Sequence, residues 1–68
     1  MSNEAKYQEL YEAEAAYRKA LHYNEWLERR MLEAPDEETF SMFADKLEAQ
    51  FMPTVMAHDR AHRLRLEF

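Results

Sequence analysis

The sequence contains no cysteine, no glycine and only two prolines among its 68 residues. Without cysteine the chain forms neither a disulfide nor a thiolate metal site. Without glycine it lacks the phosphate-binding loops and the tight hairpin turns that depend on that residue. These absences exclude glycine-rich nucleotide sites and leave helix as the expected structure.

Long apolar runs are also missing, because charged residues interrupt the chain every few positions. A membrane-spanning helix needs roughly 18 consecutive apolar residues, and a secretory signal needs a cationic stretch followed by an apolar one. We therefore expect a soluble, cytoplasmic protein with no membrane partner. The 14 acidic and 9 basic residues give a net charge of −5. This charge repels phosphate backbones and makes nucleic acid a disfavoured partner.

The first half of the chain predicts one helix over residues 3–34, because it is rich in strong helix formers and contains no proline. Its apolar side chains follow an alternating three-four spacing, with one polar exception at Asn24. The series is Leu10, Ala13, Tyr17, Ala20, Asn24, Leu27, Met31 and Ala34.

Pro35 predicts the end of this helix and a turn over residues 34–36, since proline excludes the preceding residue from helical geometry. Three acidic residues then favour a second helix over residues 36–67. Its three-four series is Phe40, Phe43, Leu47, Gln50, Thr54, Ala57, Ala61, Leu64 and Phe68. Pro53 predicts a kink over residues 52–54, or a full break that starts a third helix at residue 54.

Two arms of similar length joined by a short turn should lie antiparallel, as an all-α helical hairpin that forms a single domain over residues 1–68. This register places Leu27 opposite Phe43 and Tyr17 opposite Thr54. The polar positions of the two series either fix the register of the arms or turn toward solvent.

One seam cannot bury all the remaining large apolar side chains, and two interpretations follow. A kinked or broken second helix folds them into a three-helix core, or they form a second contact surface, on which two copies of the hairpin associate into a four-helix bundle or a partner protein docks. Aromatic residues and methionine dominate such surfaces. The predicted interface consists of Tyr23, Trp26, Met42, Met52 and Met56.

His58 and His62 stand four residues apart, which is the spacing of the zinc ligands in a zinc-protease helix, and Asp59 takes the place of the glutamate. A catalytic zinc site also needs a third ligand and a substrate cleft. We therefore expect two solvated histidines, with no metal and no other cofactor. Ser2 and Ser41 have no plausible base beside them, so the chain is not expected to be an enzyme.

Arg60, Arg63 and Arg65 make the C-terminal segment locally basic. They suit contacts with RNA or DNA, or they neutralise glutamates of the first arm, which is the simpler interpretation. The alternative function is thus a nucleic-acid-associated regulator. A further alternative is an acidic mimic of nucleic acid, although basic residues are interspersed among the carboxylates.

The start Met1-Ser2-Asn3-Glu4, the absence of glycine and the two heptad arms resemble the small helical accessory proteins of temperate, lambda-like bacteriophage early regions. The resemblance implies a regulatory protein that modulates a host factor in the host cytoplasm. The chain is also similar in architecture to the plasmid repressor-of-primer family, whose helical hairpins dimerise into four-helix bundles. It lacks the motifs of that family, so RNA binding is not carried over.

Overall fold

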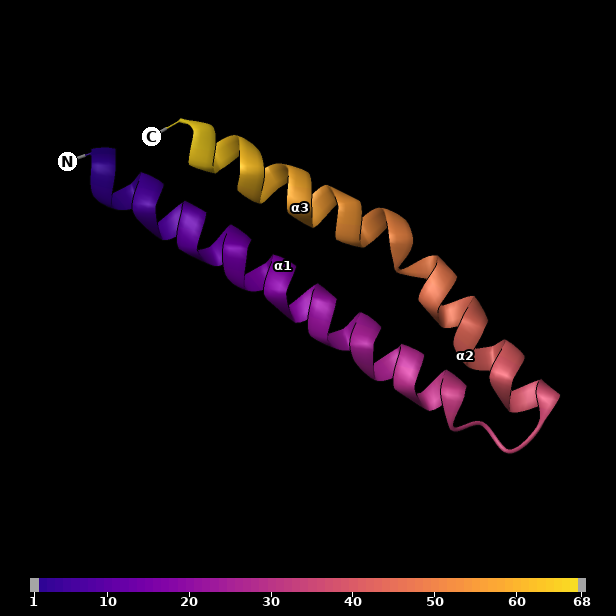
Figure 1. Cartoon of the computed structure of the whole chain (residues 1–68). Helices are drawn as coiled ribbons and strands as arrows, with labels where there is room; N and C mark the ends of the chain where they lie inside the picture. Colours follow the sequence, from indigo (N-terminus) through magenta and orange to yellow (C-terminus); the bar gives the residue numbers. More distant parts are fainter. Residues whose placement is uncertain (1, 68) are drawn as a thin grey trace.

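The computed structural model describes residues 2–67 as an elongated helical hairpin (Figure 1). Helix α1 spans Ser2–Leu32, α2 spans Glu37–Ala49 and α3 spans Phe51–Leu66, and there is no strand within this range. The second arm, α2 followed by α3, runs back along α1, so the start of α1 and the end of α3 lie at the same end of the molecule. The predicted all-α hairpin is confirmed.

The hairpin is thin, with extents of 55 × 15 × 12 Å and a radius of gyration of 15.8 Å. A compact domain of this length has a radius of gyration of about 11 Å. None of the helices in residues 2–67 is long and apolar enough to cross a membrane.

The turn between the arms is set by Pro35 and Asp36. Helix α1 ends two residues before the predicted position, and the Ala34 N–H donates to the Met31 carbonyl at 3.2 Å in a tightened last turn. Asp36 then caps α2 in an extended conformation, and its carboxylate accepts a hydrogen bond from the Thr39 backbone N–H at 2.7 Å. This backbone hydrogen bond holds the pKa of Asp36 below its ordinary value.

The second arm is bent at Gln50, where α2 ends and α3 begins. In a continuous helix Pro53 would leave the Ala49 carbonyl without a donor and would clash with it. Ending α2 at Ala49 places Pro53 in the first turn of α3, where no backbone donor is needed. The Gln50 carbonyl accepts instead from the Thr54 backbone N–H at 3.0 Å and from the Thr54 hydroxyl at 2.6 Å. The predicted start of α3 at residue 54 is therefore three residues too late.

The seam follows the predicted spacing closely. All eight positions of the first series are buried or half-buried, and Ala13 and Leu27 are buried. In the second series Phe43 and Ala61 are buried. The prediction is wrong for Phe40, which is 43% exposed; it lies in the first turn of α2, and α1 ends at Leu32, two residues before the predicted position. Phe68 lies outside the described residues.

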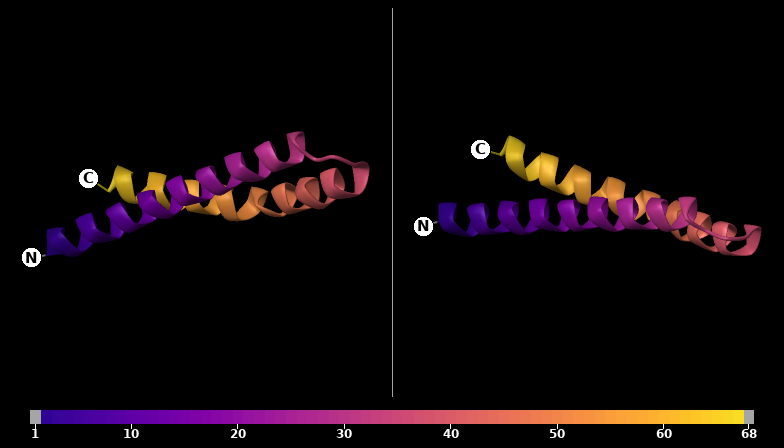
Figure 2. Two further views of the ribbon diagram at one scale, coloured as in Figure 1. Left: turned by 90° about the horizontal axis from the view of Figure 1, so that it is seen from below. Right: turned by 60° about the horizontal axis from the view of Figure 1, so that its bottom comes forward.

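The register of the two arms differs from the predicted one. Thr54 does not pair with Tyr17; its hydroxyl accepts a hydrogen bond from the Asn24 side-chain amide at 2.9 Å. The ring of Tyr17 instead meets that of His58, one helical turn further along, at a centroid distance of 5.2 Å. The second arm is bent at Gln50, whereas α1 is one continuous helix, so the two arms do not run parallel over their whole length (Figure 2). Equal residue counts along the two arms therefore do not span equal distances.

The three-helix core is not formed, because α2 and α3 lie one after the other along α1 (Figure 1). The large apolar side chains therefore stay exposed. This set comprises Tyr7, Tyr11, Leu21, Tyr23, Trp26, Leu32, Phe40, Met42, Phe51, Met52, Met56 and Leu66.

Candidate interaction surface

An aromatic–arginine cluster, made of Tyr23, Trp26, Arg30 and Phe43, joins α1 to α2. The rings of Tyr23 and Trp26 are stacked, with their centroids 6.1 Å apart. The rings of Trp26 and Phe43 meet edge to face, also with a centroid distance of 6.1 Å. The Arg30 guanidinium lies 5.8 Å from the Trp26 ring centroid and 5.7 Å from that of Phe43. Such aromatic and cation–π contacts each contribute about 0.5–1.5 kcal/mol. The four side chains therefore fix one another's orientation.

One side chain of the cluster is buried, and two are partly exposed to solvent. Phe43 is 8% exposed and packs in the seam, whereas Trp26 is 47% exposed and Tyr23 is 40% exposed. Arg30 and Phe43 were not among the predicted interface residues. The spacing of four between Trp26 and Arg30 is a signal that could have identified the arginine, because it places the two side chains on one helical face.

The structure brings together only some of the predicted interface residues. Tyr23 and Trp26 are in contact, and Met42 is 45% exposed beside Phe43 in the chain. Met52 and Met56 lie one turn apart on α3, 58% and 65% exposed. They form a separate methionine patch on the other side of the bend in the second arm.

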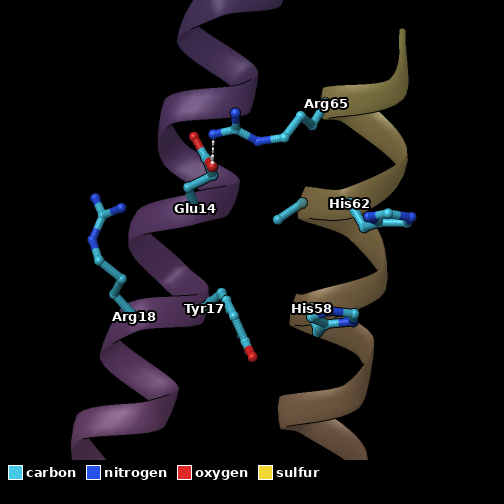
Figure 3. A pocket seen from close by; sticks show the side chains of 7 residues that line it. Glu14, Tyr17, Arg18, His58, His62 and Arg65 are labelled. Atoms are coloured by element: carbon cyan, nitrogen blue, oxygen red, sulfur yellow. Dashed lines mark hydrogen bonds and ion pairs between the residues drawn. The ribbon is translucent and has the colours of Figure 1, made fainter.

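A second group of side chains lies between α1 and α3 (Figure 3). Arg65 reaches from α3 to form an ion pair with Glu14 of α1, and Tyr17 points from α1 toward α3. A shallow hollow at this place is lined by Glu14, Tyr17, Arg18, His58, Ala61, His62 and Arg65. The sequence interpretation paired the C-terminal arginines with glutamates of the first arm, and the carboxylate that Arg65 binds is that of Glu14.

The three C-terminal arginines do not share one surface. Arg60 and Arg63 together line two hollows, one beside Met56 and one beside Glu9 and Glu67. Arg65 lines the hollow that contains Glu14, and the Glu14 carboxylate neutralises the charge of its guanidinium. Two of the three candidate nucleic-acid contacts therefore remain adjacent, next to carboxylates, and nucleic-acid binding stays a prediction.

Residues 2–67 hold no group of three or more histidine, aspartate or glutamate side chains arranged to bind a metal ion. His58 and His62 are both exposed, and their rings stack. Comparison with protein-family models, with curated proteins and with solved structures finds no match to this chain.

Proposed function

We propose that this chain is a non-enzymatic protein-interaction module that dimerises and presents the aromatic–arginine cluster to its partners. The observation that carries the proposal is the imbalance between core and surface. Among residues 3–67, whose burial the structure describes, only Ala13, Leu27, Phe43 and Ala61 are buried, while twelve large apolar side chains are exposed. Patches of this kind mark interaction surfaces on small proteins.

The exposed area supports a second copy of the chain as one partner. The hairpin exposes 5582 Å², whereas a compact monomer of this size exposes about 4,600 Å². The excess of about 1,000 Å² is close to the roughly 800 Å² that each partner buries in a stable interface. Two hairpins packed as a four-helix bundle remove an excess of this size, and a chain without cysteine has no disulfide to stabilise it instead.

The composition of the cluster supports it as the centre of the contact. Tryptophan, tyrosine and arginine dominate the binding energy of protein interfaces when they are buried there. In this cluster stacking holds all three in place before binding, so little side-chain entropy is lost on association. The flexible side chains of Met42, Met52 and Met56 can adapt to a partner surface around that centre.

The resemblance in format to accessory proteins of temperate phages supports a biological setting. We propose that the module regulates a host protein in the cytoplasm of the host cell. The non-enzymatic assignment rests on the sequence, which lacks cysteine and has no base placed beside either serine.

Sedimentation across a dilution series tests the dimer. We expect a monomer–dimer equilibrium, and Trp26→Ala should weaken it by about 30-fold, the effect of an interface residue worth about 2 kcal/mol. Leu66→Ala is the matched control, because Leu66 is 71% exposed but lies at the far end of the hairpin. Circular dichroism checks that both variants fold. A monomer at every concentration, or equal weakening by both variants, would contradict the proposal.

Retention of a host protein by the immobilised chain tests the wider function. We expect Trp26→Ala to lose the retained protein and Leu66→Ala to keep it. Retention that is equal for the two variants would remove the cluster from the proposal.

A further inference from the structure

The two histidines of α3 occupy successive turns on one face of the helix. The rings of His58 and His62 are nearly parallel, with an interplanar angle of 5° and a centroid distance of 5.9 Å (Figure 3). Small rotations about the side-chain torsions let two imidazoles at this spacing donate to one cation, as they do in helices that bind zinc. The helical backbone thus prearranges a pair of nitrogen ligands.

The environment of His58 orients one of these ligands. Asp59 places a carboxylate oxygen 3.3 Å from Nδ1 of His58. When Nδ1 donates to that carboxylate, the lone pair of Nε2 is free for a metal ion, and carboxylates hold metal-binding imidazoles in this way in many sites. The edge contact with the Tyr17 ring restricts the imidazole further.

The neighbouring charges define what kind of site this is. Glu14, the carboxylate that lines the hollow beside the histidines, forms an ion pair with Arg65 and is therefore occupied. Arg18 points away from α3. A cation at the histidine pair thus has two protein ligands, and water completes its coordination.

We propose that His58 and His62 form a two-histidine site for a borderline divalent transition cation, with Zn²⁺ as the representative ion. Neutral imidazole suits zinc, copper and nickel, whereas magnesium and calcium require oxygen ligands. The two nitrogens meet on one face only while residues 58–62 are helical, so the cation binds the folded chain and stabilises α3. This proposal is independent of the dimer and of the aromatic–arginine cluster.

Calorimetric titration of the full-length, tag-free chain with zinc chloride at neutral pH tests the site. We expect saturable binding that magnesium does not reproduce. His62→Ala should weaken zinc binding by at least about tenfold, and Asp59→Asn, which alters the group that orients His58, by about tenfold. His22→Ala and Asp45→Asn are the matched controls, because they remove an exposed imidazole and an exposed carboxylate elsewhere, and both should bind zinc as the unmodified chain does.

A relocated ligand separates geometry from composition. The double variant His62→Ala/Arg63→His keeps three histidines but sets two of them five residues apart, on different helical faces, so its zinc affinity should match that of His62→Ala. Zinc should also raise the thermal unfolding midpoint of the unmodified chain and of His22→Ala, but not that of His62→Ala. Absence of binding, or equal binding by the unmodified chain and His62→Ala, would overturn the proposal.

Discussion

The two halves of the hairpin are held together by different kinds of contact. In the turn half, where α1 packs on α2, the buried residues are Leu27 and Phe43, and Trp26 and Arg30 of the aromatic–arginine cluster pack against the Phe43 ring. In the open half, where α1 packs on α3, the buried residues are Ala13 and Ala61. Small side chains let two helices approach closely but remove little apolar area from water.

Polar contacts also hold the two helices of the open half together. Glu14 and Arg65 connect its two helices, and the Asn24–Thr54 hydrogen bond marks the boundary between the halves. An ion pair on a partly exposed surface contributes only about 0–1 kcal/mol. We infer that the turn half contributes most of the free energy of folding and that the two arms separate first in the open half. The His58/His62 pair lies in this open half, where a bound cation adds most to stability.

The largest loss of stability is expected in the turn half, from Leu27→Ala. Leu27 is 0% exposed, and truncation of a fully buried leucine costs about 2–5 kcal/mol. In a chain of 68 residues with thin stability, we expect this loss to unfold much of the population. Urea unfolding followed by circular dichroism measures the effect.

Leu66→Ala is the control in the open half. Its side chain is 71% exposed, so the free energy of unfolding should change by less than about 0.5 kcal/mol. Equal losses for the two variants would show that the stability is not concentrated in the turn half.

Leu27 also shows how far the sequence determines the fold. The three-four spacing identified it as a seam residue, along with every other covered position of the first series, because burial along a helix follows its period. Tyr17 illustrates what the spacing cannot supply. Its partner depends on how far the bend at Gln50 displaces α3, and that is a property of three-dimensional geometry.

The candidate interaction surface was likewise predictable from the sequence only in part. The exposure of Trp26 and Tyr23 follows from their positions outside the seam series. Their contacts with Arg30 and Phe43 depend on side-chain conformations and on packing between α1 and α2, which the spacing does not define. The separation of Arg65 from Arg60 and Arg63, in contrast, follows from their spacing on α3, because residues two apart on a helix lie on different faces. The ion pair of Arg65 with Glu14 depends on the packing of α3 against α1.

A smaller effect is expected at the boundary between the halves, from Thr54→Val. Valine keeps the shape of threonine but removes the acceptor for the Asn24 amide. Oδ1 of Asn24 is already buried without a partner, so this change leaves the whole amide unsatisfied. Loss of one partner from such a group costs about 1–3 kcal/mol.

The double variant Asn24→Leu/Thr54→Val tests whether the unsatisfied amide causes this loss of stability. Replacing both partners by apolar side chains removes the unsatisfied amide, so urea unfolding should show recovery of much of the loss. If the double variant is less stable than Thr54→Val alone, the polar pair stabilises the boundary, and the cost does not come from the unsatisfied amide.

The smallest effect is expected in the turn half, from Asp36→Asn. Asparagine caps a helix as well as aspartate but does not ionise. The pKa of Asp36 is lowered in the folded chain, so its ionisation adds stability at pH above its ordinary value, and this contribution is lost as the pH falls through the lowered folded pKa. The unmodified chain should therefore be slightly more stable than Asp36→Asn at neutral pH, and the difference should vanish in acid. Unfolding across a pH series measures it, with Asp45→Asn as the control, because Asp45 lies inside α2 and caps no helix end. The same pH-dependent difference in Asp45→Asn would show that it arises from loss of one negative charge, and the cap at the turn would then have no part in it.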